Sequence, residues 1–429
     1  MTSLDGTSLA AHPAVRAALV RGGVAYVVPD ARTAPMLHRA ATTELPDGLA
    51  WHEPADDLLL AGINRTETEF LCREVWADNA YLRHGIVLPE RANIVDVGAN
   101  IGMFTLLAAV RGGQGTRIVA VEPVVEAARA LEVNGRLHGV ELTVVSAAVG
   151  SREGTAMFTY YPGNTVMSGQ YADQVEDRDV LRGYLLSDTE AAGVDVSPMI
   201  AERLAPELRS VPMTTLPQVI SQTGLDAVDL LKVDVEKAEW EVLASIDEPT
   251  WGIIEQIAIE VHDLDGRLDR VLHLLRGHGY TVAADRDSRL LDTPLYTVYG
   301  HRPTARRVAA EPVRQQKWLT ARALSSELGL PVELVATLDD IGATAAAPPM
   351  PSSVAVLAEV WTEMFGPGSA RPDADFFALG GRSLSAVRLI AQVEARLGEN
   401  VLELDAVFAK PRFRDLAAQL DAGVGRADR

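Results

Sequence analysis

Acidic residues and a histidine follow two apolar stretches in the middle of the chain. One stretch ends at Asp234 and Glu236, and the other, residues 256–261, ends at His262. A carboxylate or an imidazole within hydrogen-bond reach of a hydroxyl can accept its proton as the oxygen attacks another atom. If both stretches are strands of a parallel sheet, their ends meet at one edge. We therefore predict Asp234, Glu236 and His262 as the catalytic set.

These side chains also have structural explanations. Asp234 could cap a helix that begins near Lys237, because aspartate satisfies free backbone N–H groups at helix starts. Glu239 could be a first-turn residue stabilised by the helix dipole, and we favour that role for it. Glu260 lies two residues before His262, on the same face of a strand, and could orient the imidazole. No group of residues has the spacing of a metal site, so we predict no metal.

A glycine-bearing turn follows another apolar run. Residues 94–97 (IVDV) are typical of a buried strand, and residues 98–102 (GANIG) break it before an apolar helix. A second strand, residues 117–121, ends at Glu122, roughly 20 residues beyond the turn, where a carboxylate can accept hydrogen bonds from ribose hydroxyls. The turn does not have the GxGxxG spacing typical of dinucleotide folds.

The elements around this turn alternate between strand and helix. A helix over residues 127–137 and a strand over residues 142–146 follow Glu122. Alternation of this kind predicts a parallel sheet that binds ligands at the carboxyl ends of its strands. Upstream, a helix beginning near Asn64 leads into the first strand.

Several ordered segments carry a family resemblance. VDVGANIGMFTL, VAVEP, KVDVEKAEWEVL and IAIEVH together resemble the FkbM family of S-adenosylmethionine-dependent methyltransferases, over residues 67–301. The resemblance implies an α/β class I methyltransferase with a doubly wound sheet, and S-adenosylmethionine as its cofactor. It also implies a set of cofactor-binding residues: Asp96, Gly98, Ala99, Asn100, Gly102, Glu122 and Ala147.

Two features stand out within the methyltransferase-like region. The family usually has glycine where this chain has Lys237, which matters if the backbone there needs a positive φ or a close ligand approach. The lysine could pair with a substrate carboxylate or be solvated. An aromatic and polar segment, residues 158–168, leads into a charged stretch that ends near Pro206. We expect this insertion to cover the substrate, and the alternative is a helical excursion on the surface.

The C-terminal region has apolar residues at helical spacing on both sides of the sequence DADFFALGGRSL. It resembles the peptidyl carrier proteins of nonribosomal peptide synthetases, which implies a small all-α four-helix domain. Ser383 matches the serine that carries 4′-phosphopantetheine covalently, at a helix start that favours a phosphodiester. Arg382, which precedes this serine, differs from the histidine, aspartate or asparagine that is more common there in carrier proteins. The implied partners are a phosphopantetheinyl transferase and the adenylation or other synthetase enzymes that load and unload the carrier.

Two short segments flank the methyltransferase-like region. Residues 9–29 predict a short helix and two strands, and resemble the small subdomain of adenylation domains; residues 330–339 resemble its closing part faintly. We predict that the two segments pack together as a vestigial piece. Residues 30–57 are interpreted as a connector, residues 313–328 as a helix and residues 345–353 as a linker.

The expected division is residues 1–50, an adenylation-like segment; 51–303, the methyltransferase; 304–347, a second remnant and linker; and 348–423, the carrier. The net charge is −20, with 59 acidic against 39 basic residues, and no basic stripe occurs, which argues against nucleic-acid binding. Cys72 is the one cysteine, so we expect a reducing compartment. We find neither a signal peptide nor a long apolar span, and expect a cytoplasmic protein that binds no membrane.

The combined sequence predicts methylation of a hydroxyl on an acyl or aminoacyl thioester that the chain's own carrier holds, in nonribosomal peptide or related biosynthesis. Three alternatives remain. The enzyme could methylate nitrogen or carbon of that substrate, it could methylate a free late-stage product, or the fold could be an inactive scaffold for the carrier.

Overall fold

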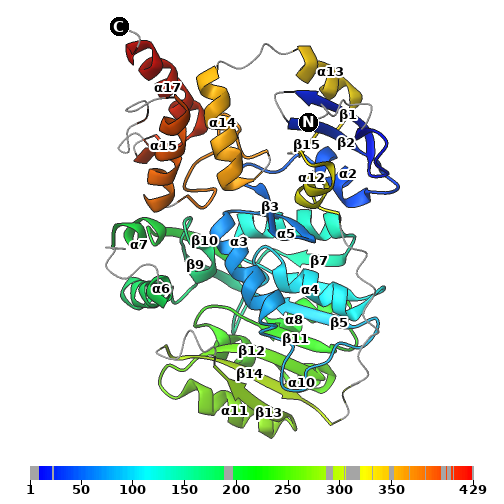
Figure 1. The fold of residues 1–429 in the computed structure, drawn as a ribbon. Coiled ribbons are helices and arrows are strands. Elements are labelled where there is room, and N and C mark those ends of the chain that lie inside the picture. The colour runs from blue at the N-terminus through cyan, green and yellow to red at the C-terminus, as the bar shows by residue number, and fades with distance from the viewer. Residues whose placement is uncertain are drawn as a thin grey trace.

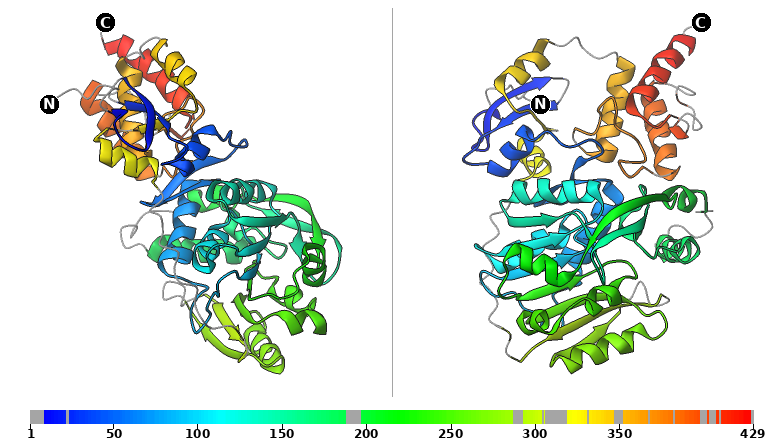
Figure 2. Two further views of the ribbon diagram at one scale, coloured as in Figure 1. Left: turned by 90° about the vertical axis from the view of Figure 1, so that its right-hand side faces the viewer. Right: turned by 180° about the vertical axis from the view of Figure 1, so that it is seen from behind.

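The computed structural model describes residues 9–427, except 22–23, 188–196, 287–292, 304, 306–318, 331, 347–351, 367, 382, 398–401, 403–406 and 409. The methyltransferase-like region forms the lower body of the molecule in Figure 1, and two smaller units lie side by side at its upper end. The view from behind shows the same arrangement (Figure 2).

A seven-stranded sheet forms the centre of the body. Its spatial order is β13 (Thr281–Asp285), β14 (Leu295–His301), β12 (Gln256–His262), β11 (Leu230–Val233), β5 (Asn93–Val97), β6 (Arg117–Val121) and β7 (Glu141–Val145). Only β14 runs antiparallel to its neighbours. The chain winds outward from β5 to β7, then returns to β11 and winds the other way. The doubly wound α/β fold predicted from the sequence is confirmed.

Apolar strands explain why helices cover both faces of this sheet. The side chains of Ile94, Val95, Leu230 and Leu231 are fully buried, because strands of a parallel sheet have no solvent-facing side. The covering helices include α4 (Met103–Gly112), α5 (Val125–His138), α8 (Leu216–Thr223), α9 (Glu239–Ala244), α10 (Glu248–Ile253) and α11 (Arg267–Gly277). The winding reverses between β5 and β11, so a crevice is expected at the carboxyl ends of these two strands.

Two additions enclose that edge of the sheet. α3 (Arg65–Cys72) begins at the capping residue Asn64, as predicted, and continues into a π-helical turn, η1 (Arg73–Ala77). On the other side, β9 (Gly154–Tyr160) and β10 (Glu207–Thr214) pair antiparallel, and β10 also pairs with β8 (Ala148–Val149). The chain between β9 and β10 carries η2 (Thr165–Met167), α6 (Gln174–Ser187) and α7 (Ser197–Arg203). The charged insertion is therefore helical.

The N-terminal unit joins segments from the two flanks of the body. β1 (Val15–Arg21) and β2 (Val24–Pro29) form a hairpin, and β15 (Val332–Leu334) lies parallel to β2, with Val332 opposite Ala25. The prediction that the two flanking segments pack together is confirmed. α12 (Ala321–Leu328) and α13 (Leu338–Ala346) belong to the same unit.

Two sequence predictions for the flanks are wrong. The supposed connector contains α2 (Pro35–Thr42), which starts with proline in its first turn, and β3 (Ala50–Ala55), which pairs with β4 (Leu58–Gly62). The helix expected over residues 313–328 begins only at Ala321, because Thr320 caps it in an extended conformation; residues 313–318 lie outside the described residues.

The C-terminal unit is helical. α14 (Ser352–Phe365), α15 (Ser383–Leu397) and α17 (Phe413–Ala427) enclose a core that includes Trp361 and Phe376. A fourth helix is not placed, because residues 398–401 and 403–406 lie outside the described residues. Most of the predicted linker, residues 347–351, does so as well. Among the described residues, no helix combines the length and the apolar character needed to cross a membrane.

Candidate active site

A cavity of about 600 Å³ opens at the carboxyl ends of the central strands. Its lining comes from the segments that follow β5, β6, β7, β11 and β12, from α3 on one side, and from η2 and α6 on the other. This volume lies in the range of small-molecule sites. The predicted insertion therefore both forms helices and lines the cavity.

Gly98 can only be glycine at this site. Its φ is +75°, and a Cβ atom built on it would lie 1.7 Å from the backbone oxygen of Asp234. The turn after β5 thus packs directly on the loop after β11. The Nζ atom of Lys232 strengthens this contact by donating a hydrogen bond to the carbonyl of Gly98 at 2.7 Å.

The predicted cofactor residues fall into two groups. Gly98, Asn100, Glu122 and Ala147 line the cavity, whereas Asp96, Ala99 and Gly102 do not. Asp96 is fully buried, and its carboxylate accepts a hydrogen bond from the Thr105 hydroxyl at 2.7 Å. Gly102, with a φ of +90°, precedes α4 and packs against Leu131.

Glu122 closes one end of the cavity. Its two carboxylate oxygens accept hydrogen bonds from the backbone N–H groups of Asn100 and Val124, both at 2.8 Å. Burial raises the pKa of Glu122 to about 7, although both hydrogen bonds oppose the shift. The carboxylate is therefore fixed in place and readily forms another hydrogen bond.

A buried lysine, which sequence reasoning did not single out, links two of the predicted acidic residues. The Nζ atom of Lys232 lies 3.3 Å from Asp96 and 3.2 Å from Asp234. Burial alone would lower the pKa of Lys232, but the carboxylates of Asp234 and Asp96 outweigh that effect and hold the pKa above its usual range. The signal available in the sequence was a charged residue inside an apolar strand.

Asp234 does not cap a helix, so that alternative is wrong. α9 begins at Glu239, and its N-cap position is Ala238. The Asp234 carboxylate instead accepts a hydrogen bond from the Tyr81 hydroxyl at 2.9 Å, beside Lys232. Tyr81 is a second residue of the site that sequence reasoning missed.

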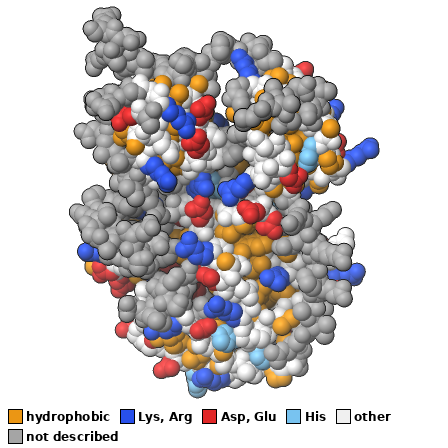
Figure 3. Space-filling model, viewed as in Figure 1, with side chains coloured by type: hydrophobic (Ala, Val, Ile, Leu, Met, Phe, Trp, Pro, Cys, Tyr) orange, Lys and Arg blue, Asp and Glu red, His pale blue; other side chains and the backbone are white. Residues whose placement is uncertain are grey.

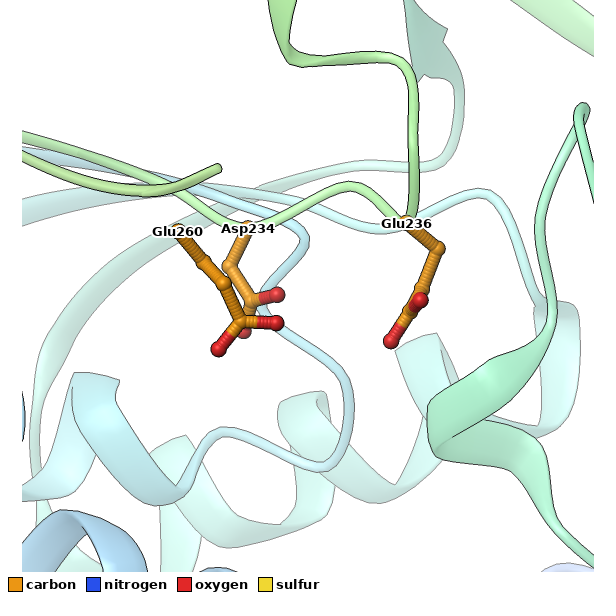
Figure 4. A group of neighbouring side chains, drawn as sticks. All are labelled: Asp234, Glu236 and Glu260. Atoms are coloured by element: carbon orange, nitrogen blue, oxygen red, sulfur yellow. The ribbon is translucent and has the colours of Figure 1, made fainter. Parts of the chain in front are cut away.

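Two further carboxylates lie beside that of Asp234. Figure 4 shows the side chains of Asp234, Glu236 and Glu260 extending to the same side of the loop and strand that carry them. Oxygen atoms of the three lie within 4.8 Å of one another, so the statement that no group has metal-ligand spacing is wrong. The three residues, named here the carboxylate cluster, are brought together by the meeting of two strand ends.

The carboxylate cluster is electrostatically strained. Burial first, and then the charges of Asp234 and Glu74, raise the pKa of Glu260 well above its usual value. Burial also raises the pKa of Glu236; the neighbouring His262 opposes this shift, and Asp234 adds to it. Carboxyl groups in this position take up protons near neutral pH more readily than ordinary ones do.

His262 is held by Glu239 and not, as predicted, by Glu260. The Nδ1 atom of His262 lies 2.6 Å from a carboxylate oxygen of Glu239, whose other oxygen pairs with Arg267. Burial lowers the pKa of His262, but the hydrogen bond to Glu239 and the charge of Glu236 outweigh it and raise the pKa. Because Nδ1 donates to Glu239, Nε2 is directed towards Glu236, 3.4 Å away.

The helix-start position predicted for Glu239 is confirmed, but this residue also carries the histidine contact. Glu236, a member of the predicted catalytic set, lies in the preceding loop with a φ of +42°. Lys237 follows with a φ of +68°, the left-handed conformation that favours glycine.

Lys237 is not solvated, so that sequence alternative is wrong, whereas its pairing with a substrate carboxylate stays a prediction. Its side chain is mostly buried and its Nζ atom contacts Glu176 at 2.9 Å and Asp177 at 3.0 Å, both on α6. Asp177 also accepts a hydrogen bond from the Tyr161 hydroxyl. The loop after β11 is thereby joined to the helices that cover the cavity.

Ser383 is the first residue of α15, as predicted for the attachment serine. Its side chain, and Arg382 altogether, lie outside the described part of the structure.

The strand order, the glycine turn after the first strand and the acidic residue after the second define a class I S-adenosylmethionine-dependent methyltransferase. The chain belongs to the FkbM methyltransferase family. Residues 96–282 match the family described as "Methyltransferase FkbM domain", and residues 355–420 match "Phosphopantetheine attachment site".

Individual relatives agree with this assignment. The 31-O-demethyl-FK506 methyltransferase FkbM of Streptomyces tacrolimicus is 38% identical over 262 residues, which cover 61% of this chain and 96% of that protein. Methyltransferase sdnD of Sordaria araneosa is 31% identical over 240 residues, 54% of this chain and 89% of that protein. The AMB antimetabolite synthetase AmbE of Pseudomonas aeruginosa is 33% identical over 419 residues, 86% of this chain but only 20% of that protein. The chain thus spans about a fifth of AmbE.

The protein is therefore a methyltransferase fused to a carrier domain of the nonribosomal peptide synthetase type. Its cofactors are S-adenosylmethionine and a covalently attached 4′-phosphopantetheine. The carrier implies interaction with a phosphopantetheinyl transferase and with synthetase partners. The cavity fits the first cofactor, because a fixed glutamate and a narrow glycine turn stand at the ends of adjacent parallel strands.

Proposed function

We propose that the enzyme methylates a hydroxyl group of an acyl or aminoacyl thioester carried on its own Ser383. The observation that carries this proposal is the His262 imidazole in the cavity wall, whose Nδ1 is held by Glu239 while Nε2 lies beside Glu236, another residue of the cavity wall. A neutral imidazole in this tautomer is suited to remove a hydroxyl proton.

The cofactor-binding set is proposed from the positions of the residues around the cavity. Glu122 would accept hydrogen bonds from the ribose hydroxyls of S-adenosylmethionine, and Ala147 would line the adenine site. Gly98, Asn100 and the turn between them would hold the methionine part. Asp96, Ala99 and Gly102 act from behind this surface by fixing the turn. S-adenosylmethionine supplies an electrophilic methyl group on its sulfonium.

The protein's own residues then position and deprotonate the nucleophile. Transfer requires the attacking oxygen to be aligned at near-attack distance, and alignment alone accounts for much of the rate of such reactions. As the oxygen attacks, its proton passes to Nε2 of His262, beside Glu236. Glu239 and Arg267 keep the imidazole oriented, and Asp234 is held by Lys232 and Tyr81 at the edge of the same space.

Oxygen is the proposed acceptor for two reasons. A hydroxyl needs a base in order to react, and the cavity holds one. The relative from Streptomyces tacrolimicus is named a 31-O-demethyl-FK506 methyltransferase, that is, for a compound that lacks an O-methyl group, which agrees with that chemistry. A tethered substrate is proposed because the carrier is part of the chain, and tethering raises the effective concentration of the substrate at the site.

The domain division is also proposed from the sheet of the N-terminal unit. Residues 1–50 and 304–347 together form one unit related to the small adenylation subdomain, residues 51–303 form the methyltransferase, and residues 348–423 form the carrier. The pairing of β2 with β15 supports the joining of the two flanks.

The test loads Ser383 with acyl-pantetheine groups by a phosphopantetheinyl transferase and acyl-coenzyme A, then adds S-adenosylmethionine. We expect the pantetheine arm to gain the mass of one methylene unit, with the new methyl on oxygen in the released product. His262→Asn should slow this by about 10²–10⁴-fold. Ser383→Ala removes the tether and is the control. Methylation of a free acid with no methylation of any loaded arm would overturn the proposal, and a methyl on nitrogen or carbon would overturn its chemistry.

A further inference from the structure

The carrier rests on the N-terminal end of α3. The Nη1 atom of Arg65, the first residue of α3, donates a hydrogen bond to the carbonyl of Phe365, the last residue of α14, at 2.8 Å. The Nε atom of the same guanidinium pairs with Glu69 one turn later, at 2.7 Å. Arg65 therefore connects the carrier to α3 through a guanidinium group that is held by two polar contacts.

The loop that precedes the attachment serine makes a second contact with α3. A Cβ atom built on Gly380 would lie 3.3 Å from the Thr66 hydroxyl and 3.7 Å from Cβ of Arg65. Gly380 has a φ of +90°, and α15 begins three residues later, at Ser383. The attachment end of the carrier therefore faces the start of α3.

α3 leads from this contact into the cavity. Thr66 and Phe70 line the cavity, as does Glu74 in the π-helical turn that continues α3. The eight helical steps from Thr66 to Glu74 span about 12 Å at the rise of a helix. A phosphopantetheine arm has the reach of nearly five extended residues, on the order of 16 Å.

The far end of this path is the reactive end of the cavity. The charge of Glu74 acts on Glu260 of the carboxylate cluster. The carrier also lies close to the N-terminal unit: burial raises the pKa of Glu333 on β15, and the charge of Arg371 in the carrier partly opposes this shift. Figure 3 shows Lys and Arg side chains, with Asp and Glu side chains among them, where the upper units meet the methyltransferase.

We propose that α3 is the track along which the arm on Ser383 enters the cavity, and that Arg65 is the positioning residue that holds the carrier at its entrance. This inference rests on the proposed function, because it concerns delivery of a tethered substrate. It assigns to the carrier a docking surface formed by Arg65 and Thr66. It assigns the contact with the arm to the side of α3 that lines the cavity.

The first experiment compares Arg65→Ala with Arg136→Ala in the loaded full-length chain. Arg136 is a matched control, because it pairs with Glu132 at the same helical spacing on α5. Arg65→Ala should slow methylation of the tethered substrate about 10-fold or more, as expected for loss of a charged hydrogen bond. Methylation of the same acyl group presented as a free N-acetylcysteamine thioester should be unchanged in both variants.

The second experiment detects the path without measuring activity. The chain carrying Phe70→Cys and a free pantetheine thiol on Ser383 is oxidised with diamide, and the products are mapped by mass spectrometry. The native Cys72 is buried. We expect an intramolecular disulfide between the arm and the introduced thiol, and none with Arg136→Cys, whose site is an exposed position on α5.

The outcomes separate this inference from the function on which it rests. If the unmodified chain does not methylate its loaded arm, the proposed function fails. If it does, but Arg65→Ala matches Arg136→Ala and Phe70→Cys is not trapped, the track along α3 is refuted while the function stands.

Discussion

Replacing Glu239 with glutamine tests the proposed base directly. Glutamine keeps the size of the side chain and one oxygen acceptor, but removes the negative charge that lies 2.6 Å from Nδ1 of His262. A hydrogen bond to a charged group contributes about 1.5–3 kcal/mol, and 1.36 kcal/mol corresponds to roughly one pKa unit. The substitution should therefore lower the pKa of His262 by about 1–2 units.

The sign of the effect on activity follows from the role of a base. His262 works in its neutral form, so the rate rises with pH through the pKa of the imidazole. Because the pKa of His262 is raised in the native enzyme, the acid limb should lie above the ordinary histidine range. In Glu239→Gln the limb should move about 1–2 pH units lower, and the plateau rate should fall because the base is weaker and less well oriented.

The assay is the pH dependence of single-turnover methylation by chains loaded at Ser383, with labelled S-adenosylmethionine. Glu248→Gln, at a largely exposed position on α10, is the control and should leave the profile unchanged. A lower plateau with an unmoved acid limb would refute the reasoning, because it would show that Glu239 supports only packing and not the titration of His262.

Three further predictions concern the rest of the site. Glu122→Gln should weaken binding of S-adenosylhomocysteine, measured by calorimetry, about 10-fold, because an amide cannot accept from both backbone N–H groups. Glu132→Gln is the control. Equal affinities of Glu122→Gln and the unmodified chain would contradict the proposed ribose contact. Lys232→Met should lower the free energy of unfolding by about 3–5 kcal/mol near neutral pH, because it leaves two carboxylates without their buried partner. Denaturant unfolding measures this, and an unchanged midpoint counts against the ion pairs. Treatment with EDTA should leave the rate unchanged, because protons and His262 relieve the charge of the carboxylate cluster; a loss restored by Mg²⁺ would show that a metal is required.

The sheet and its glycine turn could be predicted because they depend on local sequence. Apolar β-branched runs separated by helices define a parallel sheet, and the small residue at Gly98 marks a close backbone approach. The positions of Glu122, Asp234 and His262 at strand ends follow directly from that sheet.

The partner of His262 could not be predicted, because it depends on the shape of one loop. The sequence favoured a helix start near Lys237, but Glu236 and Lys237 both adopt positive φ values. The helix therefore starts two residues later, and Glu239 turns inward towards the imidazole. Non-glycine residues rarely adopt this conformation, so no rule of propensity would have placed two of them here.

The distances between side chains on neighbouring strands could not be predicted from the sequence either. In the carboxylate cluster, oxygen atoms of Asp234, Glu236 and Glu260 lie within 4.8 Å of one another. Nothing in the sequence between Glu236 and Glu260 indicates this proximity. At the N-terminus, the connector predicted over residues 30–57 contains Pro35, and proline in the first turn of a helix is favourable and begins α2.

Lys237 connects these local details to the working of the site. A lysine in the left-handed conformation costs on the order of 1 kcal/mol where glycine would cost little. Its ammonium recovers this through Glu176 and Asp177, and in doing so fixes α6 to the loop that carries Glu236. A glycine at this position would leave the backbone free to adopt the same turn but would remove the link. The departure from the family pattern therefore couples the cover of the cavity to the position of the proposed base.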